Sequence, residues 1–434
     1  MANQSSLPRI AILHKGVGDA FRYRCVHLRE QLGLLGLPCQ VRDLRPVDGR
    51  GIEECDLLFL HRVPLDGFLG KQLRMLQRKG ALVLFDTDDL VFEVEDALSL
   101  SRSVGDHWLK RALYRQDLKG LRRALHLADG AVVATQALAG RARELAKPTW
   151  VHRNAFSFEM LEISERAFRE RGPRGKKVVI GYASGTPTHE NDLALLKPAL
   201  KVILGSYPAT ELWLVGHIDG GTDWGGLSGR ITRMPFTSWR NLPRVLADFD
   251  INLAPVQLGR PFCETKSEVK YVEAALVRVP TVASATESFS FGIRHGSNGF
   301  LASGEGDWLE GLERLVVEPD LRVQMGRNAY EDAMLRYHPH VRSGELRVIL
   351  EEVLSRGGRG RFDLGHGSTG FQGTRGELAP TAKGDEQGAD TVPDRSHLYK
   401  AWYSLRYDSL QTFFLRMLSF LSMRLSGRGT AAGA

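Results

Sequence analysis

The sequence predicts an α/β protein made of two doubly wound domains, each with a parallel β-sheet between layers of helices. Three observations lead to this prediction. Short aliphatic segments alternate with amphipathic helical segments in both halves of the chain, as is typical of parallel strands buried on both faces. A basic segment with Gly and Pro at 168–177 interrupts the pattern, which then restarts. The length of 434 residues also suits two domains better than one.

The first half contains the strands of the first expected sheet. An aliphatic strand at 9–16 ends in Gly16 and precedes an amphipathic helix at 21–35. The same strand-and-helix pattern recurs up to the basic segment, and we assign residues 1–172 to this domain. Its further strands are expected within 38–44, 55–63, 80–90, 128–145 and 148–156, with a helix at 68–80 and a second one completing 128–145.

The second half repeats the alternation and is assigned to a second domain at 173–355. Gly, Ser, Thr and charged residues then replace the aliphatic periodicity at 356–395, which predicts a disordered linker, and 396–434 hold an amphipathic helix and a tail. The strands of the second domain are expected at 178–185, 211–217, 229–236, 250–256 and 279–284, followed by two amphipathic helices within 306–335.

Composition excludes several classes of protein. A formal charge of +7 over this length favours anionic partners but does not require nucleic acid. The four cysteines have no Cys-x-x-Cys spacing, so they indicate reduced thiols, neither a disulfide framework nor a zinc site. The N-terminus lacks the features of a signal peptide, and no segment is apolar enough to span a bilayer. We therefore expect a cytoplasmic protein that can still touch the inner membrane surface.

Two segments of the second half indicate a ligand site. The turn 183–188 follows a strand and is rich in Gly, Ser and Thr, so its amides and hydroxyls suit a phosphate at the helix that follows. The stretch 260–284 joins a polar loop to a helix that carries Lys270 and Glu273, and then to a buried strand. Such an arrangement suits a phosphorylated ligand rich in hydroxyls. The structural alternative is a βαβ unit with a polar turn.

Together these segments resemble the donor domain of GT-B glycosyltransferases, and most closely the retaining enzymes of family 4. The resemblance covers residues 176–335 and rests on "IGYASGTPTHENDLALL", "LWLVG", "LADFDINLAPV", the stretch 260–284 and "RHGSNGFLASGEGDWLEGLERLVVEPDLRVQMGRNA". The first half resembles the family loosely, mainly through "FDTDDLVF". The resemblance implies a hexosyltransferase that moves a sugar from a UDP- or GDP-sugar to a glycan, lipid-linked or other acceptor. It also implies retention at the anomeric carbon and no metal cofactor.

The resemblance further implies a donor site in the second domain. Glu273 matches the family's second glutamate, which binds the ribose hydroxyls, whereas Thr265 stands where the first glutamate is expected. The family's Arg and Lys after the first strand of this domain are absent here, so we expect Lys266 and Lys270 to neutralise the diphosphate and to act in catalysis. The donor-binding residues expected in this domain are Ser184, Gly185, Thr186, His189, Pro235, Thr265, Ser267 and Glu273.

The first domain is expected to complete the cleft. His61 ends a strand at the place where the family's histidine contacts the donor sugar, which implies a catalytic role, with a surface histidine as the structural alternative. The first βα loop borders the diphosphate or the acceptor in this fold. The residues assigned to this side are Gly16 and Gly18 for the donor and Arg22, Arg24, Asp88 and Asp89 for the acceptor.

The sequence is also compatible with three other interpretations. Asp86-Thr87-Asp88 is an Asp-x-Asp, the metal-binding pair of the GT-A fold, but the donor pattern lies in the second half, so we interpret Asp88 and Asp89 as cleft or helix-capping carboxylates. The segment "GVGDAF" has two glycines of the dinucleotide fingerprint and Phe21 in place of the third, which disfavours an NAD-dependent enzyme. A non-catalytic nucleotide- or sugar-binding protein of the same fold is the main alternative.

The predicted C-terminal helix at 397–425 has a broad aromatic face flanked by Lys and Arg. Such a helix suits the interface of an anionic membrane, where it would bring the domains to a lipid-borne acceptor. A helix packed on its own domains, or a dimer contact, is the alternative. No carboxylate pair with glycosidase spacing is evident in the sequence, so no protein nucleophile is assigned.

Overall fold

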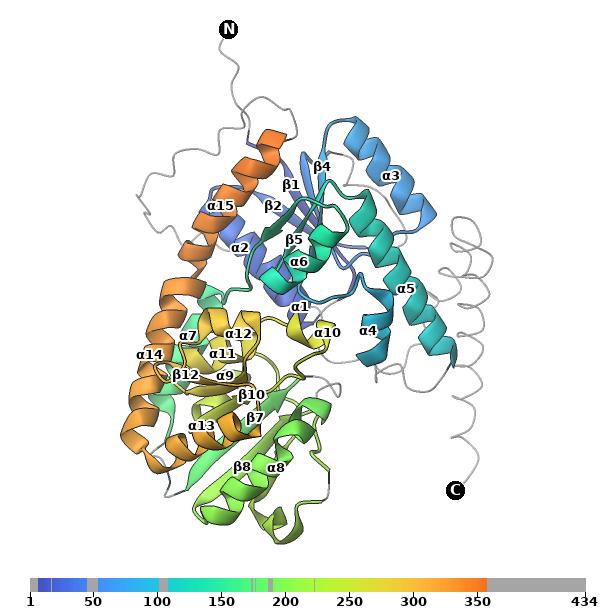
Figure 1. Cartoon of the computed structure of the whole chain (residues 1–434). Coiled ribbons are helices and arrows are strands. Elements are labelled where there is room, and N and C mark those ends of the chain that lie inside the picture. The colour runs from blue at the N-terminus through green and yellow to red at the C-terminus, as the bar shows by residue number, and fades with distance from the viewer. Residues whose placement is uncertain are drawn as a thin grey trace, which may run out of the picture.

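The computed structural model describes residues 7–16, 18–44, 54–100, 108–172, 175, 177–185, 190–221 and 223–356. These residues form two six-stranded sheets, each flanked by helices (Figure 1). All strand pairs within the two sheets are parallel, which confirms the predicted fold class. None of the described helices combines the length and the apolar character that crossing a membrane requires. Apart from Arg356, the predicted linker and C-terminal helix lie outside the described residues.

The first sheet has the strand order β2-β1-β3-β4-β5-β6. Two apolar cores pack against its strands, so β3 and β4 are buried almost throughout. This burial explains why their sequences are continuous apolar runs instead of alternating patterns. Its strands are β1 (Ile10–His14), β2 (Cys39–Asp43), β3 (Leu57–His61), β4 (Leu82–Thr87), β5 (Gly130–Val133) and β6 (Thr149–Val151), and its helices are α1 (Asp19–Phe21), the π-helix η1 (Arg22–Val26), α2 (His27–Leu34), α3 (Gly67–Arg78), α4 (Val94–Leu100), α5 (Trp108–Leu127) and α6 (Gln136–Glu144).

The second sheet has the strand order β12-β11-β10-β7-β8-β9. One large core contains side chains of β7, β8, β10, α8 and α13. Its strands are β7 (Val178–Ser184), β8 (Thr210–Gly216), β9 (Ile231–Met234), β10 (Ile251–Ala254), β11 (Thr281–Ser284) and β12 (Gly299–Ala302). Its helices are α8 (Glu190–Ser206), η4 (Gly225–Arg230), α9 (Leu242–Ala247), α10 (Pro261–Glu264), α11 (Val269–Leu276), α12 (Glu287–Gly292), α13 (Glu305–Val317) and α14 (Pro319–Tyr337).

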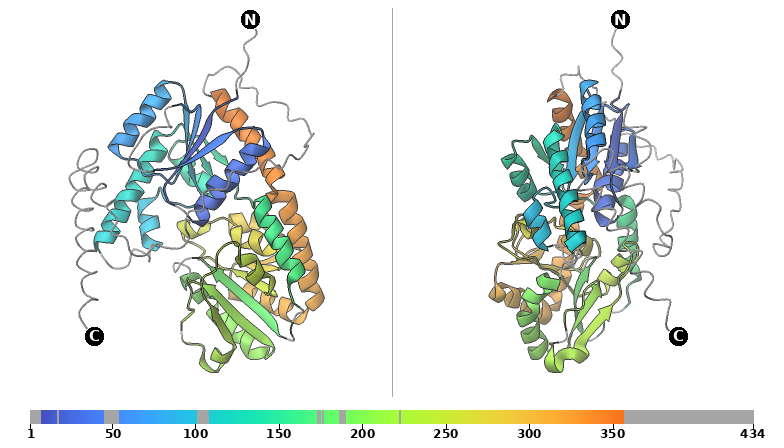
Figure 2. Two further views of the ribbon diagram at one scale, coloured as in Figure 1. Left: turned by 180° about the vertical axis from the view of Figure 1, so that it is seen from behind. Right: turned by 90° about the vertical axis from the view of Figure 1, so that its right-hand side faces the viewer.

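The chain passes between the two domains twice. The first passage is the segment 152–157 followed by helix α7 (Phe158–Glu170). The aliphatic pattern predicts a strand up to residue 156, but β6 ends at Val151. The next three residues have buried polar side chains that bond to both domains instead of extending the sheet. The second passage is helix α15 (Pro339–Arg356), which leaves α14 and runs back along the first domain (Figures 1 and 2).

Helix α15 completes the core of the first domain. Leu346, Leu350 and Val353 join the apolar cluster that contains residues of β1, β3 and α2. The end of the segment assigned from sequence to the second domain is therefore packed on the first. Neither domain is therefore formed by one continuous stretch of sequence. The core of the first domain includes residues after 338, and an apolar cluster of the second domain includes residues before 172.

In both sheets the strand order reverses beside the first strand of the domain. In the first sheet β1 lies between β2 and β3, and in the second sheet β7 lies between β8 and β10. Ligands of doubly wound proteins bind beyond the carboxyl ends of the strands at such a point. The segments that follow β1, β3, β7 and β10 are therefore expected to form the ligand site.

A buried ion pair lies at the centre of the first domain. Asp86, at the end of β4, accepts hydrogen bonds from Nε of Arg24 (3.0 Å) and from Nδ1 of His61 (2.9 Å), and all three side chains are buried. Arg24 also donates to the carbonyl group of His152 in the first passage. Burial opposes the ionisation of Asp86, but Arg24 and His61 outweigh it and lower the pKa of Asp86 to about 2.

We expect Asp86→Asn to lower the free energy of unfolding by about 3–5 kcal/mol, because it leaves Arg24 buried without a countercharge. Urea denaturation near neutral pH measures this loss. Asp117→Asn, which breaks an exposed pair with Lys15, is the control and should cost less than about 1 kcal/mol. The folded-state pKa of Asp86 lies below its ordinary value, so its contribution is complete above about pH 4 and is lost as the pH falls towards 2. Equal stability of Asp86→Asn and wild type at neutral pH would contradict this role.

Candidate functional site

A cavity of about 560 Å³ lies between the carboxyl ends of the two sheets. Residues that follow β1, β3 and β4 form one wall, and residues at the ends of β7, β8 and β10, together with the start of α11, form the other. Both points of strand reversal thus open onto the same space, as the topology predicts. The predicted site residues that line it are Arg22, Asp88, Asp89, Ser184, Gly185, Lys266, Ser267, Lys270 and Glu273.

Other predicted site residues lie elsewhere. The side chains of Arg24 and His61 bond to Asp86 inside the first domain, and neither residue is among those that line the cavity. Thr265 is buried, and its hydroxyl donates to the carbonyl group of Phe262. Gly16, Gly18 and Pro235 are not among the described residues that line the cavity, and Thr186 and His189 lie outside the described residues.

Two lysines line the second-domain wall. Lys270, in the first turn of α11, donates to the carbonyl group of Ala183 near the end of β7, and its ammonium group lies 4.6 Å from the centre of the Tyr182 ring. Burial lowers the pKa of Lys270 to about 8. Lys266 lies in the preceding loop, with Nζ 4.0 Å from the carboxylate of Asp192. Positive charge therefore reaches the end of β7 from α11 and its loop.

Glu273 lies three residues after Lys270 on the same helix and also lines the cavity. Its Oε1 accepts hydrogen bonds from the hydroxyl group of Tyr23 (2.7 Å) and from the guanidinium group of Arg22 (3.4 Å). Burial raises the pKa of Glu273, whereas Arg22 and Tyr23 favour its ionised form. The carboxylate therefore joins the two domains at the cavity wall.

The sequence pattern did not predict that part of the cavity is apolar. It lies beyond the ends of β8 and β9, where the ring of Phe236 is 53% exposed and stacks on His217 with ring centres 5.1 Å apart. Gly216 has a φ of 100°, and a Cβ there would lie 2.0 Å from the carbonyl oxygen of Ser184, so only glycine fits. Ligands of doubly wound proteins bind beyond the carboxyl ends of the strands, and this principle applied to β8 and β9 could have located the region. Its lining residues are Val215, Gly216, Phe236, Thr237, Trp239, Leu242 and Leu246.

The first-domain wall contains an arginine held between two carboxylates. Nη2 of Arg62 donates to Asp88 and to Asp89, each at 2.6 Å. Arg62 has a φ of 50°, in the left-handed region, directly after β3. Both aspartates of the Asp-x-Asp segment are thus paired with arginines, Asp86 with Arg24 and Asp88 with Arg62. Within the described part of the chain, no group of three or more His, Cys, Asp and Glu is placed to hold a metal ion.

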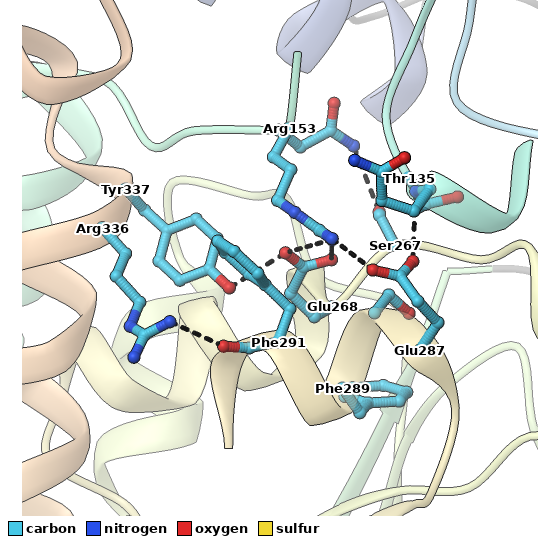
Figure 3. Close-up of polar contacts among 12 residues, drawn as sticks. Thr135, Arg153, Ser267, Glu268, Glu287, Phe289, Phe291, Arg336 and Tyr337 are labelled. Atoms are coloured by element: carbon cyan, nitrogen blue, oxygen red, sulfur yellow. Dashed lines mark hydrogen bonds and ion pairs between the residues drawn. The ribbon is translucent and has the colours of Figure 1, made fainter. Parts of the chain in front are cut away.

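A polar cluster, buried except for Glu287, joins the domains beside the cavity (Figure 3). Arg153, from the first passage, lies between Glu268 at the start of α11 and Glu287 at the start of α12. Its Nη1 donates to the two carboxylate oxygens of Glu268 at 3.3 and 3.4 Å, and its Nη2 donates to Glu287. The hydroxyl group of Tyr337 also donates to Glu268, at 2.9 Å. The ring of Phe291 lies 3.8 Å from the Arg153 guanidinium carbon.

Further bonds from the first domain hold the loop before α11. The hydroxyl group of Thr135 donates to the carbonyl group of Thr265 at 3.0 Å, and the amide of Asn154 donates to the hydroxyl group of Ser267 at 3.1 Å. This loop presents Lys266 and Ser267 to the cavity. The position of these two residues therefore depends on contacts with the first domain.

No family model and no curated protein matches the sequence. Among solved structures, HepE from Anabaena in complex with UDP-glucose is similar, with a TM-score of 0.54, 16% identity and coverage of 80% of this chain and 100% of that chain. Sucrose-phosphate synthase from Thermosynechococcus elongatus has a TM-score of 0.56 at 15% identity, with coverage of 80% and 100%. This chain has the GT-B fold. A glycosyltransferase from Rickettsia africae has a TM-score of 0.52 at 11% identity, with coverage of 80% and 99%.

The cluster around Arg153 joins the two domains beside the cavity. We expect Arg153→Met to lower the free energy of unfolding by about 3–5 kcal/mol, because Glu268 would be buried without its cation. Thermal or urea denaturation measures the change. Arg314→Met, which breaks an exposed pair with Glu318, is the control and should cost less than about 1 kcal/mol. Wild-type stability of Arg153→Met would show that the pair is dispensable.

Proposed function

We propose that this protein is a glycosyltransferase that moves a sugar from a nucleoside diphosphate sugar to a hydroxyl group of an acceptor, with retention at the anomeric carbon. The observation that carries the proposal is the cavity at the meeting point of the two domains, whose wall bears Lys270 and Glu273 three residues apart on α11. A diphosphate requires cations, and a ribose diol requires a hydrogen-bond acceptor. The likeness in fold to HepE, solved with UDP-glucose, supports a donor of this class.

The lining residues suit the three parts of such a donor. Lys266, Lys270 and the backbone at Ser184 and Gly185 suit the diphosphate, and Glu273 suits the ribose hydroxyls. The apolar region around Phe236 suits the base, because aromatic and aliphatic side chains bind its faces. The sugar would then lie towards the first-domain wall.

Catalysis would depend on electrostatic stabilisation of the leaving group. As the bond from the anomeric carbon to the diphosphate breaks, negative charge grows on the phosphate oxygens, and Lys266 and Lys270 are placed to balance it. The burial of Lys270 strengthens such an interaction relative to water. The pairing of Asp86 and Asp88 with arginines supports a reaction that needs no divalent metal.

The acceptor would lie against the first-domain wall formed by Arg62, Asp88, Asp89 and Tyr114. Carboxylates and a phenol bind hydroxyl groups, which supports a glycan or a lipid-linked sugar as the acceptor. For a lipid-linked acceptor, the basic and aromatic composition of 397–425 supports attachment to an anionic membrane surface. That segment lies outside the described residues.

Two alternatives differ in what they require. An NAD-dependent enzyme would use the glycine loop after β1, yet the first sheet is ordered β2-β1-β3 and not 3-2-1-4-5-6 as in dinucleotide-binding domains, and Gly16 and Gly18 are not among the described lining residues. A non-catalytic nucleotide- or sugar-binding protein is favoured by one observation: Tyr182 or Ser184, and His189, stand where the family carries its Arg and Lys. Turnover separates this alternative from an enzyme.

Release of nucleoside diphosphate from a panel of UDP- and GDP-sugars, with and without sugar acceptors, tests the function. We expect at least one donor to be turned over, and Lys270→Met to lower kcat/KM by about 10–100-fold, because a charge-assisted bond worth about 1.5–3 kcal/mol is lost. Lys201→Met, an exposed lysine on α8 outside the cavity lining, should retain wild-type turnover. Activity should persist in EDTA.

Nucleotide binding without any turnover would assign the chain to the non-catalytic alternative. Binding of NAD without binding of nucleotide sugars would contradict the proposal altogether. Loss of activity in EDTA with recovery in Mn²⁺, abolished by Asp88→Asn, would instead make the Asp-x-Asp segment a metal site.

The alkaline limb of the pH profile identifies the lysine that carries the charge. Burial lowers the pKa of Lys270 to about 8, so the ammonium group is charged below this pH and neutral above it. We expect kcat/KM, which reports the free enzyme, to fall as the pH rises through about 8. Lys270→Arg, which keeps its charge, should shift this decline to higher pH. An unchanged alkaline limb in this variant would mean that another group titrates.

A further inference from the structure

The carboxylate that faces the cavity from α11 is held by the opposite domain. Tyr23 and Arg22 both donate to Oε1 of Glu273, at 2.7 and 3.4 Å. Among the described residues, the other oxygen, Oε2, has no hydrogen-bond partner. Because Glu273 lines the cavity and its side chain is 13% exposed, Oε2 remains for a ligand.

The two donors are themselves fixed. They are the first residues of the π-helix η1, a rare form of helix that often occurs at functional sites. Both side chains are buried, and Arg22 also donates to Asp19 at 3.0 Å. Its guanidinium carbon lies 4.4 Å from the ring centre of Tyr23 and 4.9 Å from that of Trp239. These contacts fix the Tyr23 ring, so its hydroxyl group approaches Oε1 of Glu273 in a single orientation.

We propose that Tyr23, supported by Arg22, is a positioning residue for ribose recognition: it holds Oε1 of Glu273 so that Oε2 is presented to the ribose hydroxyls. This inference rests on the proposed function, which places the ribose at Glu273. It adds that the first domain takes part in recognising the donor nucleotide. Ribose recognition is then complete only while the two domains are closed on each other as they are here.

The charges around Glu273 support this role. Burial raises the pKa of Glu273 and so favours the neutral acid, which is a poorer acceptor for two hydroxyl groups. Arg22 and Tyr23 of the first domain favour the ionised form, as does Lys270 on the same helix, whereas Asp19 opposes it. Loss of the Tyr23 hydroxyl group would both release Oε1 and raise the pKa of Glu273 further.

Tyr23→Phe tests the proposal, with Tyr337→Phe as a matched control. Each variant removes one phenolic hydroxyl group that donates to a glutamate of the 268–273 segment, but Tyr337 and Glu268 are outside the cavity lining. The probes are UDP, GDP and their 2′,3′-dideoxy analogues, and calorimetry measures the dissociation constants. We expect wild type and Tyr337→Phe to prefer the ribonucleotide. Tyr23→Phe should lose about tenfold in ribonucleotide affinity and leave the affinity for the analogue unchanged.

The pH dependence of ribonucleotide affinity gives a second measurement that a purely structural role would not move. Affinity should fall at acidic pH as Glu273 is protonated, and in Tyr23→Phe this fall should begin at higher pH than in wild type or Tyr337→Phe. A Tyr23→Phe protein that keeps the wild-type preference for the ribonucleotide and the wild-type pH profile would overturn the inference. An equal loss of affinity for the ribonucleotide and for its dideoxy analogue would overturn it as well.

Glu273→Gln distinguishes orientation from direct contact. If this variant keeps the preference for the ribonucleotide while Tyr23→Phe loses it, Tyr23 acts without Glu273 and the inference fails. A wild-type protein that binds nucleotides but does not distinguish the dideoxy analogue overturns the ribose role of Glu273 and this inference, yet leaves the proposed reaction standing. A wild-type protein that binds neither UDP nor GDP overturns the proposed function itself.

Discussion

Carboxylates that are wholly or largely buried, and so need a countercharge, determine how this molecule is put together. Removing a carboxylate from water without a partner costs several kcal/mol, so each buried acid must find a cation nearby. Three of them find an arginine of the first domain. Two of the three acids belong to the second domain, so their ion pairs with first-domain arginines also hold the two domains together. The pairs are Asp86 with Arg24, Glu268 with Arg153 and Glu273 with Arg22.

The position of α11 follows from two of these pairs. Glu268 precedes the first turn and Glu273 lies in the second, so the first domain holds this short helix at two points. Lys270 lies between them and cannot move far from the end of β7, where Ala183 accepts its hydrogen bond. A cation and a carboxylate are thereby presented to one cavity from a rigid element, as recognition of a charged and hydroxylated ligand requires.

The course of the chain reinforces this arrangement. The first passage does not act as a simple linker, because Arg153 and Asn154 contact the loop and the helix that form the second-domain wall. The second passage ends in α15, whose leucines fill the core under β1 and β3. The domains are thus joined by polar contacts and by apolar packing, since Tyr23 of the first domain belongs to an apolar cluster of the second and Phe262 packs on the core of the first.

Local sequence pattern determined the two doubly wound domains, since strands buried on both faces must be apolar along their length and the helices between them must be amphipathic. Local pattern together with the family resemblance assigned Ser184, Lys266, Lys270 and Glu273 to one site, and all four line one cavity. It did not place the apolar region around Phe236, although Pro235 beside it was expected to bind the donor.

Only the tertiary structure decided which partner each charged side chain takes. His61 ends β3 and Arg24 lies in η1, and both were expected to bind a ligand, yet both side chains bond to Asp86. Tyr23 and Glu273 are 250 residues apart, and Arg153 and Glu268 are 115 apart. Local pattern reports which face of a strand or helix is apolar. The pairing of distant charges depends on how two separate cores pack against each other, and that is set by shape and charge compensation across the interface.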